Sequence, residues 1–141
     1  MRLVQDTNVF VAALRSGAGA SRRVLASCLR RVHDPLMGAA LWNEYQDLLS
    51  RPELWEHSQT TPAQREIILD ALASVAIWVQ IWFRWRPNLA DEGDNHVFEL
   101  ALNGNAAALV TFNLGDFHRG QTHIRGLDIL TPGEFVRKYP V

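Results

Sequence analysis

Residues 1–14, MRLVQDTNVFVAAL, contain the transition that decides the fold. The apolar pair Leu3 and Val4 predicts a short buried strand, and Asp6-Thr7-Asn8 ends it. The apolar residues that follow suit the first turns of a helix. Asp6 therefore lies where a strand gives way to a helix, at the edge of an α/β sheet where ligands bind. A polar residue there also caps the helix, so this stretch alone leaves both roles of Asp6 open.

The rest of the chain repeats the alternation of strands and helices. Residues 33–37, the β-like stretch near 79–83, the apolar run AAALVTF (106–112) and LDIL (127–130) predict strands. Helices are predicted over 21–31, from Leu41 until Pro52, from Pro62, from Val97 to near Gly104, and from the cap Thr131. The alternation predicts an α/β fold with a mostly parallel sheet. We expect one domain over residues 1–141, because this length buries a substantial core.

The overall composition is that of an ordinary globular protein, with 48% apolar and 21% charged residues. A net charge of −1 excludes a global basic field. Two arginine pairs, Arg22-Arg23 and Arg30-Arg31, are either a local anion site or a solvated helix face. The lone Cys28 excludes a disulfide framework and a CxxC zinc site. Without a signal peptide or a membrane-spanning run, the protein is expected in the cytoplasm.

Four acidic residues recur at comparable structural places. Asp6 and Asp116 follow predicted strands, Asp94 opens a predicted helix, and Glu44 lies beside the apolar stripe of another helix. Parallel strand ends lie side by side, so the acids are able to converge there. Converging carboxylates either become protonated or bind a cation. Oxygen ligands without Cys or His favour Mg²⁺ or Mn²⁺, which activate water for phosphodiester hydrolysis.

Each acid also has a structural interpretation when it is taken singly. Asp6 and Asp94 are able to act as helix caps, Glu44 as a solvated residue, and Asp116 in an Asx turn. Two rival acid-pocket enzymes fit poorly. A haloacid-dehalogenase-type phosphatase needs a second aspartate where Asn8 stands, and a response-regulator receiver needs a strand-end lysine, whereas Lys138 is the only lysine.

The pattern as a whole resembles the PIN-domain family, and most closely its small bacterial toxins, the VapC-like ribonucleases. The motifs that carry this resemblance are DTNVF, LWNEYQDLL, DEGDNHVFELAL, VTFNLGDF and LDILTPGEFV, and they cover the chain in order. The resemblance implies a three-layer α/β/α sandwich around the sheet. It also implies a Mg²⁺- or Mn²⁺-dependent endoribonuclease, a homodimer, and a cognate antitoxin as partner. A PIN module that binds RNA or protein without catalysis is the alternative.

Carried over residue by residue, the resemblance makes Asp6, Glu44, Asp94 and Asp116 the catalytic acids. Asp6, Asp94 and Asp116 would hold the metal, and Glu44 would complete or orient its ligands.

Five further residues are auxiliary in this interpretation. Thr7, Asn8 and Thr111 would donate or accept hydrogen bonds around the acids. Asn113 stands where some relatives have an aspartate, so either Asn113 or Asp116 faces the metal. Asp91 would substitute for Asp94 or join it through a water.

The histidines and tryptophans are not assigned to the catalytic site. All five histidines are expected to be surface or structural residues, and His96 is expected to point away from the acids. The tryptophans are either core residues or a partner surface. Trp78, Trp82 and Trp85 form one stripe if their segment is helical, whereas in a strand Trp85 lies opposite the other two.

Overall fold

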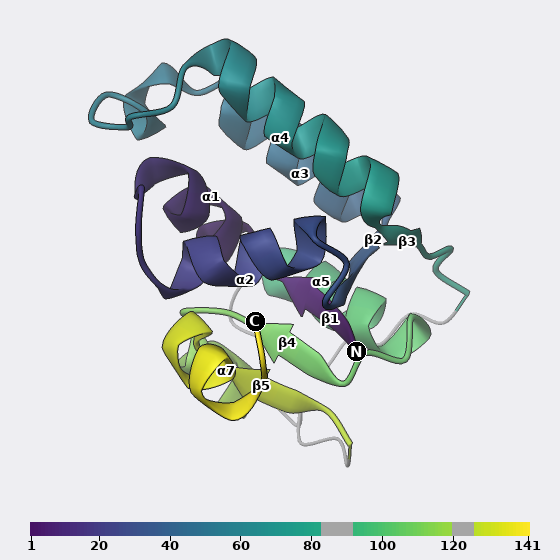
Figure 1. Ribbon diagram of the computed structural model, residues 1–141. Coiled ribbons are helices and arrows are strands. Elements are labelled where there is room, and N and C mark those ends of the chain that lie inside the picture. The colour runs from purple at the N-terminus through teal and green to yellow at the C-terminus, as the bar shows by residue number, and fades with distance from the viewer. Residues whose placement is uncertain (83–91, 120–125) are drawn as a thin grey trace.

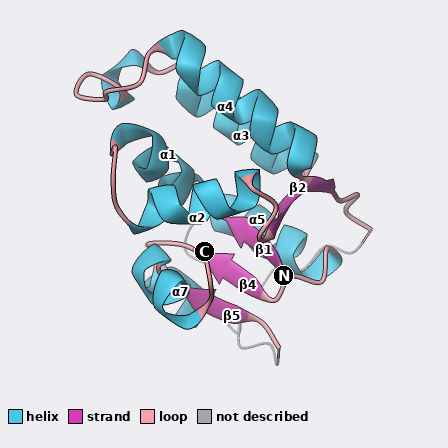
Figure 2. Cartoon of the chain, in the orientation of Figure 1, coloured by secondary structure: helices cyan, strands magenta, loops and turns pink. Residues whose placement is uncertain are grey.

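The structure, a computed structural model, describes residues 1–82, 92–119 and 126–141, without the side chains of 92–95, 116, 118 and 119. Five strands form one sheet in the order β3-β2-β1-β4-β5, and every pairing between the described strands is parallel (Figure 2). The predicted parallel sheet is therefore confirmed. The strands are β1 (Arg2–Gln5), β2 (Asp34–Met37), β3 (Ile77–Trp78), β4 (Ala108–Val110) and β5 (Asp128–Leu130).

Helices cover both faces of this sheet, as a three-layer α/β/α fold requires. In Figure 1, α2 and α7 lie in front of the strands and α5 lies behind them, while α3 and α4 form a pair beyond β2 and β3. The described helices are α1 (Thr7–Arg15), α2 (Ala20–Leu29), α3 (Ala39–Leu49), α4 (Pro62–Val75), α5 (Glu92–Asn103), α6 (Leu114–Arg119) and α7 (Pro132–Lys138), with the 3₁₀ turn η1 (Pro52–Leu54). None of the described helices combines the length and apolarity needed to cross a bilayer.

The first strand and helix form as their sequence predicts. Leu3 and Val4 are fully buried in the centre of the sheet. Asp6 has extended backbone angles, φ −63° and ψ 156°, and caps α1 by accepting a hydrogen bond from the Thr7 backbone N–H. Behind this cap, four residues of α1 pack into the core: Val9, Phe10, Ala13 and Leu14. The strand-to-helix junction is thus fixed by core packing on both sides of Asp6.

Helix α3 is fixed over the end of β1 by one aromatic residue. The Tyr45 ring stacks on Phe10, with the ring centroids 4.3 Å apart and an interplanar angle of 14°. The Tyr45 hydroxyl donates to the Gln5 carbonyl at 2.6 Å. Burial raises the pKa of Tyr45 well above its usual value, so this hydroxyl stays protonated. Glu44, the preceding residue, is thereby held near the carboxyl end of β1.

Several element boundaries differ from the prediction. Helix α3 ends at Leu49, shortly before Pro52 as predicted, and Pro52 then opens the unpredicted turn η1. The β-like stretch near 79–83 is not a strand where the structure describes it, through Trp82; only Ile77–Trp78 pairs with β2. Helix α5 begins at Glu92 rather than near Val97, and α6 was not predicted.

The tryptophans divide between the core and the surface. Trp55 is buried against the Arg65 guanidinium, 4.7 Å from its ring centroid. Trp42 is half-buried and meets the exposed Trp78 edge-on, with the ring centroids 5.6 Å apart. Trp82 is also exposed. Trp85, which the prediction placed relative to Trp78 and Trp82, lies outside the described residues.

Replacing Tyr45 with phenylalanine should test its hydrogen bond without removing the ring stack. We expect Tyr45→Phe to lower the free energy of unfolding by about 1–3 kcal/mol, because the Gln5 carbonyl loses a buried donor. Urea denaturation measures this loss. Tyr139→Phe is the matched control, since the Tyr139 hydroxyl donates to Asp128 nearer the surface, and it should cost less. Equal losses in the two variants would contradict the proposed importance of the Tyr45 bond.

Candidate functional site

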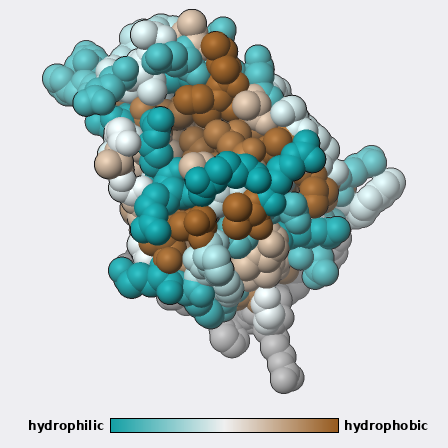
Figure 3. All heavy atoms as spheres, in the orientation of Figure 1, coloured by the Kyte–Doolittle hydropathy of each residue, from teal (hydrophilic) through white to brown (hydrophobic). Residues whose placement is uncertain are grey.

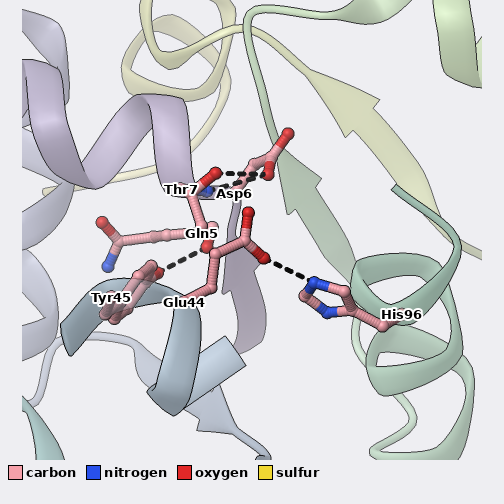
Figure 4. Close-up of polar contacts among 6 residues, drawn as sticks. All are labelled: Gln5, Asp6, Thr7, Glu44, Tyr45 and His96. Carbon is pink, nitrogen blue, oxygen red and sulfur yellow. Dashed lines mark hydrogen bonds and ion pairs between the residues drawn. The ribbon is translucent and has the colours of Figure 1, made fainter. Parts of the chain in front are cut away.

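The centre of the site is the buried carboxylate of Asp6, which is only 3% exposed. Its Oδ1 accepts a hydrogen bond from the Thr7 backbone N–H at 2.8 Å (Figure 4). Its Oδ2 accepts one from the Thr111 hydroxyl, also at 2.8 Å. Burial raises the pKa of Asp6, and the nearby Glu44 carboxylate raises it further, while the two hydrogen bonds oppose this shift. The site therefore holds a carboxylate whose charge is only partly compensated.

A second carboxylate, Glu44, faces this region from α3. Its Oε2 lies 2.5 Å from His96 Nε2 on α5 (Figure 4). Both side chains are partly exposed, 36% for Glu44 and 22% for His96. The His96–Glu44 contact thus joins two helices at the mouth of the site.

The prediction that His96 points away from the acids is wrong. Helix α5 starts earlier than its apolar residues indicate, and its packing against α3 turns His96 toward Glu44. The two residues are 52 positions apart, and no spacing in the sequence marks them as partners. Sequence reasoning therefore missed His96, because only the arrangement of α3 and α5 reveals it.

Two other hydrogen bonds fix the loop after β4, one within the loop and one to α1. Thr111 is fully buried, and its hydroxyl oxygen accepts the Asn113 backbone N–H at 3.0 Å. The side-chain oxygen of Asn8 accepts the Phe112 backbone N–H at 3.3 Å. Asn8 thus orients the loop backbone, whereas Thr7 and Thr111 contact the Asp6 carboxylate itself.

The remaining predicted acids are placed only in part. Asp94 lies in the first turn of α5 and Asp116 lies in α6, but their side chains are outside the described atoms, as is the whole of Asp91. Within the described residues, no three His, Cys, Asp or Glu side chains are close enough to hold a metal ion. The structure consequently leaves the choices between Asn113 and Asp116, and between Asp91 and Asp94, as predictions.

The described atoms nevertheless suit a hard cation. Asp6 is desolvated, and Glu44 is close enough to raise its pKa. The described hydrogen bonds to the Asp6 carboxylate all come from neutral groups, those of Thr7 and Thr111. Carboxylate oxygens in this setting favour Mg²⁺ or Mn²⁺ over softer metals.

The other histidines have structural or surface places where they are described. His33 is buried, with Nε2 2.6 Å from the Pro140 carbonyl oxygen and its ring edge-on to Phe135. His57 is exposed. The His118 side chain and the whole of His123 lie outside the described atoms. His96 is thus the described histidine that contacts a predicted catalytic acid.

Replacing Asp6 with asparagine should stabilise the metal-free protein at pH 7, by about 1 kcal/mol, a common gain for relieving a destabilised functional site. The neutral amide avoids the cost of a buried charge and still offers partners to Thr7 and Thr111. Because burial raises the pKa of Asp6 above its usual 3.8, the folded wild type binds a proton before the unfolded chain does as the pH falls. Wild-type stability should therefore rise relative to the variant as the pH falls from neutrality toward 3.8.

Urea denaturation in chelator, at a series of pH values, measures this difference. Asp70→Asn, at an exposed position of α4, is the control and should show little change. A loss of stability in Asp6→Asn at pH 7 would show that the Asp6 hydrogen bonds outweigh the cost of its burial.

Comparison with known proteins places this site in a family. The PIN domain family profile matches residues 2–115. The crystal structure of VapBC2 from Rickettsia felis, bound to a DNA fragment from its promoter, is similar with a TM-score of 0.62 and 18% identity, covering 92% of this chain and 98% of that chain. This likeness shows a common fold. No protein of curated function matches the sequence. Because the family profile covers most of the chain, the protein belongs to the PIN domain family.

Proposed function

We propose that the protein is a metal-dependent endoribonuclease that cleaves RNA phosphodiester bonds, and that it is the toxin of a toxin–antitoxin pair. The observation that supports this most is the buried Asp6 carboxylate, held by Thr7 and Thr111 with a second carboxylate nearby. Burying a charge lowers stability, and ionisable groups perturbed in this way cluster at functional sites. Membership of the PIN domain family supports the same activity.

In this proposal Asp6, Asp94 and Asp116 hold Mg²⁺ or Mn²⁺, with Asn113 and Asp91 as alternative or additional ligands. When bound, the cation would activate water and stabilise the charge that develops on the phosphate. Thr111 and Thr7 keep the Asp6 carboxylate in one orientation through their hydrogen bonds. His96 contacts one oxygen of Glu44 from the facing helix, which would restrict the orientation of the Glu44 carboxylate at the mouth of the site.

We further propose that an antitoxin protein binds to the surface of this chain and that the chain forms a homodimer. The similar structure from Rickettsia felis is a VapBC2 complex. On this chain, apolar surface gathers along α4 and on its side facing α2 (Figure 3). A surface pocket of about 490 Å³ lies there, lined by Leu14, Ile67 and Ile68 and by polar residues that include Arg22 and Gln64. Ile67 is 67% exposed, and a protein partner would remove such apolar surface from water.

Cleavage of RNA should require both the cation and the acids. We expect the purified protein to cleave mixed-sequence single-stranded RNA with Mg²⁺ or Mn²⁺ and to be inactive in chelator. Asp6→Asn and Asp94→Asn should each lose about 100-fold or more of the cleavage rate, because the cation contributes several kcal/mol to such reactions. Gel-resolved time courses measure the rates. Asp70→Asn serves as the surface control, and a matched DNA tests the substrate class.

Cleavage that persists in chelator, or that Asp6→Asn leaves intact, would contradict the proposed mechanism. Cleavage of the DNA in preference to the RNA would contradict the proposed substrate.

Cation binding should also be visible without catalysis. At 100 times its dissociation constant, Mg²⁺ or Mn²⁺ should stabilise the folded protein by about 2.7 kcal/mol. Thermal unfolding with and without the cation measures this gain, which Asp6→Asn should abolish and Asp70→Asn should preserve. No stabilisation of the wild type, together with no cleavage, would favour a PIN module that binds RNA or protein without catalysis.

A further inference from the structure

We propose that Phe112 is a platform on which one base of a single-stranded RNA stacks beside the acidic site. The inference rests on the proposed ribonuclease function and deepens it, because it names a residue that would hold the substrate. The proposed contact with RNA is made by an uncharged aromatic side chain, in addition to the predicted acids.

The place of Phe112 in the fold points to this role. It directly follows Thr111, whose hydroxyl donates to the Asp6 carboxylate. Val110 and Thr111 are fully buried, yet the next residue, Phe112, is 50% exposed. Because consecutive Cα atoms are about 3.8 Å apart, the Phe112 backbone lies beside the residue that holds Asp6, and its half-exposed ring is accessible to a ligand that reaches this loop.

The backbone of Phe112 is fixed from both sides. Its N–H donates to the Asn8 side chain in the first turn of α1. The next N–H, that of Asn113, donates to the Thr111 hydroxyl oxygen, and α6 begins immediately afterwards at Leu114. Thr111, whose hydroxyl donates to the Asp6 carboxylate, therefore also holds the backbone of this loop. A ligand that stacks on Phe112 would therefore meet a preorganised backbone, which reduces the entropic cost of binding.

An aromatic side chain suits the electrostatics of this location. The carboxylates of Asp6 and Glu44 repel phosphate, and an arginine placed among them would pair with the acids and compete with a cation. Stacking on the face of a ring holds a nucleotide through its base and needs no charge. Base faces are accessible in single-stranded RNA and covered in a duplex, so the platform selects single strands.

Trp82 provides a matched comparison. It is another exposed aromatic residue, at 82%, but its backbone N–H donates to Asn103 at the last residue of α5. His96, which marks the site on α5, is seven residues earlier, or about 10 Å along the helix axis. Removal of the Trp82 ring should therefore leave RNA bound at the acidic site unaffected.

The test measures the binding of fluorescein-labelled, mixed-sequence single-stranded RNA by anisotropy, in the Asp6→Asn background that prevents cleavage. Adding Phe112→Ala should raise the dissociation constant about tenfold, whereas Phe112→Trp should preserve it, because stacking contributes at this scale and tolerates any aromatic ring. Phe112→Leu should behave as Phe112→Ala does. Trp82→Ala should have no effect, and the same RNA as a duplex should bind weakly to every variant. Thermal unfolding checks that each variant remains folded.

Three outcomes would overturn the platform: unchanged binding in Phe112→Ala, full binding in Phe112→Leu, or an equal loss in Trp82→Ala. RNA cleavage by the wild type together with unchanged binding in Phe112→Ala would overturn the platform alone. Loss of binding in Phe112→Ala, with no cleavage by the wild type under any cation, would overturn the proposed reaction and leave the stacking contact standing. Absence of both binding and cleavage would overturn both.

Discussion

The burial of one carboxylate where β1 meets α1 is the constraint on which the described site depends. Asp6 caps the first turn of α1, and in its buried position its other oxygen accepts a hydrogen bond from Thr111 at the end of β4. That second bond requires β1 and β4 to be neighbours in the sheet, although they are about a hundred residues apart in sequence. The fold therefore determines the site, because the strand order places the Thr111 hydroxyl beside the buried Asp6 carboxylate.

The sequence predicts best those features that depend on local patterns. The apolar pair Leu3-Val4 and the apolar run around Leu109 both lie in buried strands at their predicted places. Thr61 caps α4 and Thr131 caps α7 through side-chain bonds to Gln64 and Glu134, as expected of helix starts before proline.

Features that depend on distant partners were harder to predict. The stretch from Ile77 to Trp82 has high strand propensity, but among these described residues only Ile77 and Trp78 pair with β2, so the tertiary context overrides the propensity. His96 illustrates the same limit in the site, because its contact with Glu44 exists only once α3 and α5 pack together. The acid positions themselves were visible in the sequence, since strand ends and helix starts are local features, whereas the hydrogen-bond donors to Asp6 could be proposed only by resemblance.

The contact between Phe10 and Tyr45 has a consequence for how the site responds to its occupants. The stack joins α1, which begins after Asp6, to α3, which carries Glu44. The backbone positions from which these two side chains extend are thus fixed by packing inside the core. The backbones of α1 and α3 therefore cannot move apart to reduce the repulsion between the two acids. A substitution that loosened the stack would free the two helices to shift relative to each other, and would change the spacing of the acids without touching either of them.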